Sequence, residues 1–131
     1  AMVASWVSQA SFEPPGLTVA VAKDRAIEAL MQVGDRFVLN VLRDDNHQEL
    51  LRHFLKRFPP GADRFAGVNV LEGVAAGGPV LADALAFLGC RVVQRLEGPD
   101  HWIIYAEVEQ GNVSDTEAAT AVHHRKVGNH Y

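Results

Sequence analysis

Residues 85–110 read LAFLGCRVVQRLEGPDHWIIYAEVEQ, and this stretch decides the fold class. Two runs of mostly apolar residues, several of them β-branched or aromatic, flank the break Glu97-Gly98-Pro99-Asp100. Such residues favour strands, and a short break with glycine and proline is typical of the turn in a β-hairpin. The sequence therefore predicts two neighbouring antiparallel strands, Leu85–Leu96 and His101–Gln110.

The chain on the N-terminal side of this hairpin predicts further strands. Apolar runs bounded by glycine and proline indicate them at Met2–Ala10, Leu17–Ala22, Arg36–Leu42 and, more briefly, Val68–Leu71. The first two strands are separated by a turn at Phe12–Gly16, because adjacent prolines cannot continue a ladder.

Two short helices are expected between the strands. Apolar residues at helical spacing predict them over Arg25–Val33 and Asn46–Leu55. Asp24 is the expected N-terminal cap of the first helix, and Asp44 or Asp45 that of the second. Helices do not follow strands regularly, which disfavours a doubly wound parallel sheet. The predicted fold class is therefore mainly β, an antiparallel β-barrel with short α-helices.

Composition narrows the function classes. The 131 residues suit one domain, and 48% hydrophobic with 21% charged residues excludes a disordered chain. A net charge of −4 gives no sign of a general nucleic-acid binder. Cys90 is the single cysteine, so no internal disulfide can form, which fits a cytoplasmic protein. No apolar run is long enough to span a membrane, and no secretion signal opens the chain.

Nucleotide-binding motifs with glycine-rich loops are absent from the sequence. Neither the dinucleotide fingerprint G-x-G-x-x-G after a strand nor the P-loop pattern occurs. A bound nucleotide would therefore be held by another kind of site.

Three serines and one tryptophan lie in the first predicted strand and the turn that follows it. Ser5, Ser8 and Ser11 are spaced by three, which does not keep side chains on one strand face. The serines indicate either a polar shelf that meets a ligand or the solvent face of an edge strand. Trp6 either stacks on a planar ligand or fills the core.

Two other groups of polar residues are candidate sites. In Lys23-Asp24-Arg25 two cations meet the start of a predicted helix, which suits either a phosphate or a plain capped helix. His101 follows Asp100, whose carboxylate would orient its ring. The tail histidines lack carboxylate or thiol partners at ligand spacing, so we expect no metal site.

Ordered blocks along the chain resemble the flavin reductase-like, FMN-binding split-barrel family. These blocks are residues 4–15 (ASWVSQASFEPP), 36–42 (RFVLNVL), 63–68 (DRFAGV) and 79–86 (PVLADALA). A narrower likeness, through residues 4–11, 46–48 and 123–131, is to the C-terminal flavin reductase domain of cyanobacterial flavodiiron proteins, also called diflavin flavoproteins.

The family resemblance implies an FMN-binding split barrel that forms a homodimer. It further implies an NAD(P)H:flavin oxidoreductase, in which the flavin receives a hydride from the nicotinamide. In flavodiiron proteins a di-iron domain and a flavodoxin-like domain precede this one, and together they reduce oxygen to water. The resemblance therefore implies that this chain is a fragment of a longer polypeptide and passes electrons to those domains.

The resemblance also assigns roles to individual residues. The Ser5–Ser8 strand, including Trp6 and Val7, would lie along the flavin, with Ser11 at the adjoining turn. Other positions in the family's cofactor site correspond to Lys23, Arg25, Phe54 and His123. Asp100-His101 corresponds to a Gly-Asp-His motif linked with nicotinamide binding, which makes His101 the expected catalytic residue.

Two further expectations follow from the same comparison with the family pattern. Relatives have another strand before the Ala4 strand, so the first strand of the family is expected to be missing here. The alternative function is a non-enzymatic FMN-binding module that transfers electrons or mediates dimerisation.

Overall fold

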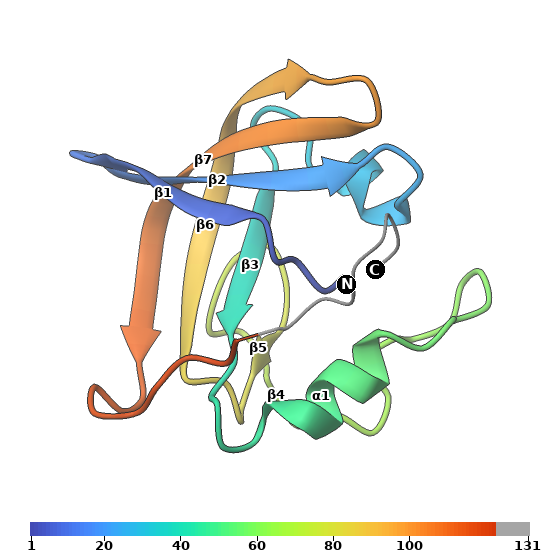
Figure 1. The fold of residues 1–131 in the computed structure, drawn as a ribbon, viewed down its shortest axis with the longest axis vertical. Helices are drawn as coiled ribbons and strands as arrows, with labels where there is room; N and C mark the ends of the chain where they lie inside the picture. The colour runs from blue at the N-terminus through green and yellow to red at the C-terminus, as the bar shows by residue number, and fades with distance from the viewer. Residues whose placement is uncertain (123–131) are drawn as a thin grey trace.

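The computed structural model describes residues 1–122 and consists mainly of one five-stranded antiparallel sheet with strand order β1-β2-β7-β6-β3 (Figure 1). Its strands are β1 (Val7–Phe12), β2 (Pro15–Ala22), β3 (Arg36–Val41), β6 (Ala86–Glu97) and β7 (His101–Val113). A small second sheet pairs β4 (Val70–Leu71) with β5 (Val80–Leu81), and the helices are the 3₁₀-helix η1 (Ala26–Leu30) and α1 (His47–Phe54). The predicted class, a mainly antiparallel β-barrel with short helices, is confirmed.

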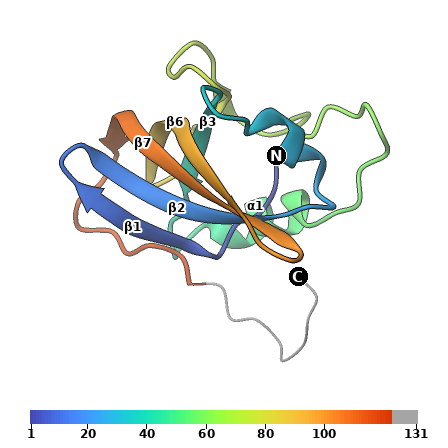
Figure 2. The ribbon, with the colours of Figure 1, turned by 90° about the horizontal axis from the view of Figure 1, so that it is seen from above.

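The predicted hairpin of β6 and β7 forms the centre of the sheet. Both strands are long and bend, so that the start of β7 runs beside β2 while its end follows β6 (Figures 1 and 2). The ladder between these two strands has register shifts between Gly89 and Cys90 and between Val92 and Gln94. Such bulges sharpen local twist, which curls the sheet toward a barrel.

Alternation along β2 and β7 builds the core on the inner face of this sheet. Leu17, Val19 and Val21 are buried, and so are Ile104 and Ala106 on the neighbouring strand. The intervening residues of both strands point to the outer face. Each fully buried aliphatic side chain of this kind contributes roughly 1.5–3 kcal/mol, so the hairpin and β2 hold the barrel together.

A separate apolar cluster lies under α1. It contains buried Leu50, Leu81 and Ala84, with Phe54 packed against them. The Asn40 side chain joins this region to the sheet, because its amide donates to the Pro79 carbonyl and its oxygen accepts from the Leu81 N–H at 2.8 Å.

The helix predicted over Arg25–Val33 is wrong, because the structure has only the 3₁₀-helix η1 there. Its N-terminal cap position is Arg25, which makes no side-chain capping bond, so Asp24 does not cap it. Ile27 and Met31 instead pack against the core, and this tertiary contact holds the segment.

The second predicted helix is confirmed as α1, but its expected caps are wrong. Asn46 holds the cap position and makes no side-chain capping bond. The predicted turn at Phe12–Gly16 is also shorter than expected, because Phe12 pairs with Pro15 and leaves only Glu13 and Pro14 between the strands.

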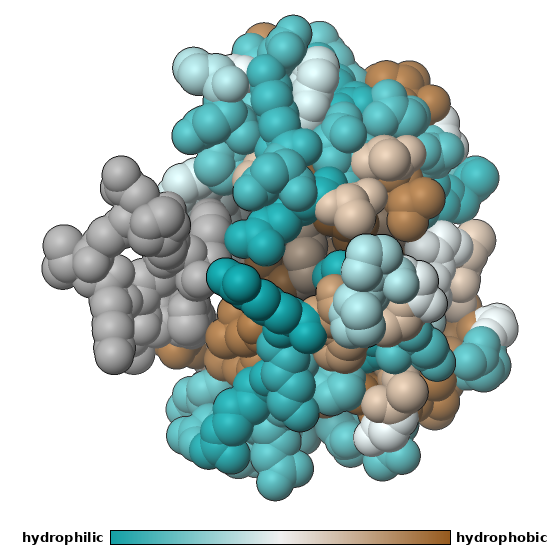
Figure 3. Space-filling view, turned by 90° about the vertical axis from the view of Figure 1, so that its right-hand side faces the viewer, coloured by the Kyte–Doolittle hydropathy of each residue, from teal (hydrophilic) through white to brown (hydrophobic). Residues whose placement is uncertain are grey.

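Within residues 1–122, β1 forms one edge of the five-stranded sheet. Met2 and Ala4, which precede it, pack against the core of the barrel. No helix in this part of the chain is long and apolar enough to cross a membrane. Seen from the side on which η1 and α1 lie, the surface is mostly hydrophilic, with hydrophobic residues visible in a central depression (Figure 3).

Candidate functional site

The open edge of β1 supplies backbone hydrogen-bonding groups. The Ala20 N–H donates to the Trp6 carbonyl at 3.0 Å, and Val7 lies opposite Val19 in the same ladder. In an antiparallel ladder hydrogen-bonded and non-hydrogen-bonded pairs alternate, so the N–H and C=O of Val7 turn away from β2. In the sheet formed by residues 1–122 no strand covers that side. The edge of a polar planar ring could bind there.

The serines of the first strand divide between different surroundings. Ser5 and Ser8 are exposed, whereas Ser11 is partly buried beyond a register shift. The Ser8 hydroxyl donates to the Gln9 carbonyl at 3.2 Å. As the spacing of three predicted, the serines do not form one continuous row.

Cross-strand register places another two hydroxyl residues beside Ser8. Ser8 lies opposite Thr18, and Thr18 lies opposite Tyr105, so the three share the outer face of the sheet. The sequence analysis did not single out Thr18 or Tyr105, since neither belongs to a local motif and only the pairing of β1, β2 and β7 brings them together.

His101 lies between an indole ring and a carboxylate. It opens β7 opposite Ala22, and its ring centroid lies 5.1 Å from that of Trp6 at an interplanar angle of 45°. Its Nδ1–H donates to Asp100 Oδ1 at 2.9 Å. This hydrogen bond holds the pKa of Asp100 below its ordinary value. Because Nδ1 is the donor, Nε2 remains to accept or donate a hydrogen bond to a ligand.

Lys23 is held at the same end of the sheet by three contacts. Its backbone N–H donates to the Asp100 carbonyl at 3.0 Å, and its Nζ lies 2.8 Å from Glu97 Oε1. The same ammonium lies 5.5 Å from the Trp102 ring centroid. Hydrogen bonding by Lys23 lowers the pKa of Glu97. The structure thus places Trp6 against His101 and bonds the Lys23 backbone to the neighbouring Asp100, whereas the sequence analysis considered these residues separately.

Arg25 lies two residues further, at the start of η1. Its side chain is half exposed, and its Nε lies 3.7 Å from Asp24 Oδ1. Since η1 has only five residues, a phosphate here would be held by the side chains of Lys23 and Arg25 and not by a helix terminus.

Phe54 belongs to the separate cluster under α1. Its ring makes edge contacts with His53 and Phe65 at centroid distances of 5.0 and 5.5 Å. The structure therefore does not bring Phe54 into the group around His101. His123 and the other tail histidines lie outside the described residues. Among residues 1–122 no group of histidine, cysteine and carboxylate side chains could hold a metal ion.

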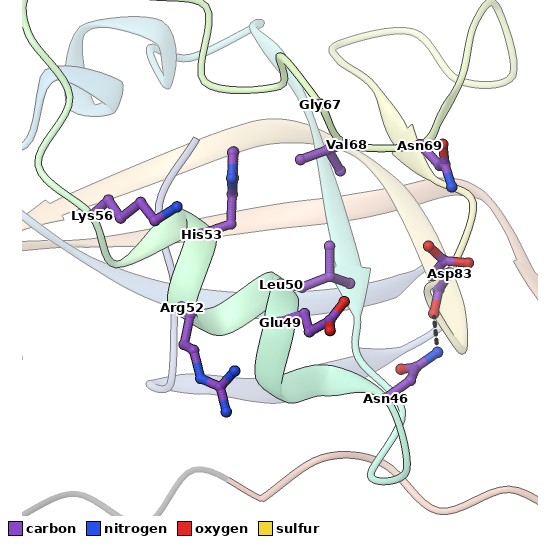
Figure 4. A pocket seen from close by; sticks show the side chains of 10 residues that line it. All are labelled: Asn46, Glu49, Leu50, Arg52, His53, Lys56, Gly67, Val68, Asn69 and Asp83. Atoms are coloured by element: carbon purple, nitrogen blue, oxygen red, sulfur yellow. Dashed lines mark hydrogen bonds between the residues drawn. The ribbon is translucent and has the colours of Figure 1, made fainter.

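A pocket of about 500 Å³ lies beside α1, apart from these groups (Figure 4). Leu50 and Val68 form its apolar part, and Asn46 donates to the Asp83 carbonyl at 3.1 Å on its wall. The lining contains two cationic side chains, Arg52 and Lys56, and two carboxylates, Glu49 and Asp83, so its formal charges balance. None of the residues predicted for the site lines it.

The sequence analysis did not identify Glu97, Arg95 or Glu28 as part of the contacts that lead from Lys23 and the Trp102 ring. Glu97 binds Lys23, and the Arg95 guanidinium lies 4.2 Å from the Trp102 ring centroid while it binds Glu28. They could be found only from the register of the strands. Glu97 pairs with Trp102, and Ala22 pairs with His101, so the end of β2 lies beside the turn of the hairpin.

The donor set at this end of the sheet suits a particular kind of ligand. Free backbone groups of β1 and nearby hydroxyls can bind the edge of a planar ring. Two cations can bind a phosphate, and an aromatic residue and a histidine can contact a second ring. These residues therefore fit a phosphate-bearing planar cofactor.

Comparisons with known proteins agree with this chemistry. The sequence matches the family model "Flavin reductase like domain" over residues 1–129. It is 67% identical over 131 residues to diflavin flavoprotein A 1 of Synechocystis sp.. The match covers 100% of this chain but only 23% of that relative, so the chain spans about a quarter of its length.

Solved structures share the fold. The NADH:FAD oxidoreductase SgcE6 of Streptomyces globisporus aligns with a TM-score of 0.78 and 30% identity, covering 91% of this chain and 70% of that one. The same oxidoreductase in complex with NAD and FAD fragments aligns with a TM-score of 0.77 and 28% identity, covering 91% of this chain and 69% of that one.

Proposed function

This chain belongs to the family of flavin reductase like domains, and on that premise we propose that it is an NAD(P)H-dependent reductase domain whose flavin is FMN. The observation that carries the proposal is the contact of Trp6 with His101 at the end of β2, beside the open edge of β1, with Lys23 joined to the same end of the sheet by its backbone bond to Asp100. A ring-binding edge, a phosphate-binding cation and an oriented histidine lie within one region of the sheet.

Each residue contributes a distinct binding function in this proposal. The Val7 backbone groups and the hydroxyls of Ser5, Ser8 and Ser11 hold the flavin, and Trp6 borders its ring system. Lys23 and Arg25 bind the phosphate. Bound flavin supplies the redox chemistry, accepting a hydride from the reduced nicotinamide.

His101 orients the nicotinamide. The bond from Nδ1 to Asp100 fixes the ring plane, so Nε2 keeps a constant direction toward the substrate. Phe54 and His123 stay predicted cofactor contacts that have their origin in the family resemblance alone.

The same proposal extends to the polypeptide in which the chain occurs. Since the diflavin flavoprotein relatives are about four times longer, we infer that electrons pass from this domain to flavodoxin-like and di-iron domains of the same polypeptide. A homodimer and a cytoplasmic location belong to the proposal too, the latter because the single cysteine is buried and unpaired.

The visible absorption spectrum of the purified chain tests the proposal. With added FMN it should show the absorption of a bound oxidised flavin, and anaerobic NADH or NADPH should bleach that absorption. If the flavin binds but neither nicotinamide reduces it, the chain is the alternative, a non-enzymatic FMN-binding module. A protein that stays colourless after FMN addition would contradict both functions.

A further inference from the structure

Arg95 has an unusually enclosed side chain for a charged residue. It lies on β6 opposite the fully buried Ile104, and only 9% of its side chain is exposed. Its guanidinium binds the Glu28 carboxylate of η1, and its Nε has no hydrogen-bond partner. Removing a charge from water costs free energy that a single ion pair does not fully return.

Stability alone therefore gives a poor account of this arginine. Buried ion pairs can often be replaced by apolar side chains of similar volume without loss of stability. An unpaired buried Nε adds a further cost. The free-energy cost of enclosing Arg95 indicates that it has a role besides stability, and its contacts indicate which role.

The contacts of Arg95 lead to both cations proposed to bind phosphate. Its guanidinium lies 4.2 Å from the centroid of the Trp102 ring, against which the Lys23 ammonium lies at 5.5 Å. On the other side, the backbone N–H of its partner Glu28 donates to the Arg25 carbonyl at 2.9 Å. A displacement of Arg95 would thus reach Lys23 through the indole ring and Arg25 through η1.

We propose that Arg95 is a positioning residue: by holding Glu28 and the Trp102 ring, it fixes Lys23 and Arg25 in the places from which they bind a phosphate. This inference rests on the proposed flavin-binding function. Since only 9% of its side chain is exposed, Arg95 would act through these neighbours and not by binding the phosphate itself.

The test compares FMN with riboflavin, which lacks the phosphate. Dissociation constants of the chain for both ligands are measured by fluorescence titration, together with a melting curve. Arg95→Met, which keeps most of the volume, should weaken FMN binding roughly tenfold, about the loss of one charge-assisted hydrogen bond, and change riboflavin binding less than about twofold. The melting temperature should fall, because Glu28 loses its partner, so the deciding measurement is the ratio of the two dissociation constants, which a general loss of stability leaves unchanged.

Arg91→Met is the matched control, because Arg91 lies on the same strand and pairs with Glu107 and Glu109 on the surface. It should leave the ratio of the two dissociation constants unchanged. Arg95→Lys, which keeps the charge without the planar group, should recover part of the ratio. In a Lys23→Ala, Arg25→Ala background, Arg95→Met should have no further effect on the ratio.

Three results would overturn the inference. In the first, Arg95→Met weakens FMN and riboflavin by the same factor, as a purely structural residue would. In the second, its effect persists in the background without Lys23 and Arg25. In the third, the parent chain binds both ligands equally, which removes the phosphate site but leaves the flavin reductase function standing. A parent chain that binds neither flavin would instead contradict the proposed function itself.

Discussion

Lys23 is the residue whose charge we expect to favour FMN, which carries a phosphate, over riboflavin, which does not. Its ammonium already binds Glu97 at 2.8 Å, so a phosphate would have to share or replace this carboxylate. We expect the double change Lys23→Ala, Arg25→Ala to weaken FMN binding by about 1.5–3 kcal/mol for each charged hydrogen bond lost, with riboflavin nearly unaffected.

We expect the opposite effect on FMN affinity from a change at Glu97, the carboxylate that pairs with Lys23. Glu97→Gln removes the negative charge that competes with a phosphate, so it should strengthen FMN binding and leave riboflavin binding unchanged. Isothermal titration of the double variant and of Glu97→Gln, each with FMN and with riboflavin, measures the four dissociation constants, which are compared with those of the parent chain. Equal losses for FMN and riboflavin in the double variant would place the phosphate elsewhere.

A change at His101 should separate the binding of the nicotinamide from the binding of the flavin. Its side chain touches Trp6 and Asp100, and of these two only Trp6 is also a proposed flavin contact; the others are the Val7 backbone, the serines and the two cations. His101→Ala should therefore raise the KM for NAD(P)H several-fold, by roughly the 1 kcal/mol of one hydrogen bond, with the FMN dissociation constant unchanged.

Steady-state kinetics at several nicotinamide concentrations, beside a flavin titration and a melting curve, check this expectation. A fall in FMN affinity and melting temperature, with the KM for the nicotinamide unmoved, would show that His101 is only structural. A fall in kcat would instead assign it to the transition state.

Among the elements, those with a strong local pattern could be predicted from the sequence and those held by distant contacts could not. The hairpin strands β6 and β7 and the helix α1 follow from apolar periodicity and turn residues. The two-residue strand β5 depends on the Asn40 side chain, 41 positions from Leu81 in sequence, and no local signal records that bond. The 3₁₀-helix η1 likewise depends on tertiary packing of Ile27 and Met31.

The residues of the candidate site divide in the same way, into those with a local sequence pattern and those that only distant contacts bring together. His101 beside Asp100 and the cations Lys23 and Arg25 could be found in the sequence, because adjacent residues suggest chemistry by themselves. The contacts of Lys23 with Glu97 and of Arg95 with Trp102 could not, since they arise from the register of three strands. The family resemblance implies a place for Phe54 at the cofactor site, whereas in the structure it packs in the cluster under α1.

The loop between β4 and β5 offers a test of packing at the scale of one element. Gly77 has a φ of 103°, and a Cβ there would lie 2.5 Å from the backbone carbon of Arg36 in β3. Gly61 has a similar φ of 78° but nothing within 4 Å of the position of a Cβ. Gly77→Ala should therefore lower the free energy of unfolding by about 2–4 kcal/mol, and Gly61→Ala by about 1 kcal/mol.

Urea denaturation of both variants measures this difference, in which Gly61→Ala controls for the backbone conformation alone. Flavin affinity should change little in either variant. Gly77 lies in the loop between β4 and β5 and Gly61 in the segment between α1 and β4, and no residue of either is proposed to bind flavin. Equal destabilisation by the two changes would mean that the loop does not pack against β3 as the structure has it.

At the scale of the whole molecule, the chain combines a barrel core with a smaller cluster under α1. Among the links that join them are the Asn40 bonds, the bond from the Ser114 hydroxyl to the Ala84 carbonyl, and the Arg64 guanidinium, which donates to the Ala1 carbonyl at 2.8 Å. The residues proposed to bind flavin belong to the barrel, so its integrity should determine cofactor binding more than that of the α1 cluster does. Global unfolding of the barrel can be followed through its one cysteine.

Cys90 is 1% exposed and packs with Leu17 and Ala106 in the barrel core. Burial, with a smaller contribution from Glu109, raises the pKa of its thiol from 9.0 to about 11. The folded state therefore keeps its proton more tightly than the unfolded state. The contribution to stability is complete below the unfolded value of 9.0 and is lost as the pH rises toward about 11.

We expect this one thiol to lower the free energy of unfolding by about 2–3 kcal/mol between pH 9 and pH 11, at about 1.4 kcal/mol per unit of pKa difference. Cys90→Ala should be less stable at pH 8, because it leaves a small cavity, but its stability should fall less steeply above pH 9. Urea denaturation of both proteins from pH 8 to pH 11 measures the difference, in which the titration of every other group cancels. If the two stability curves run parallel over that range, the thiol is not buried in the folded barrel.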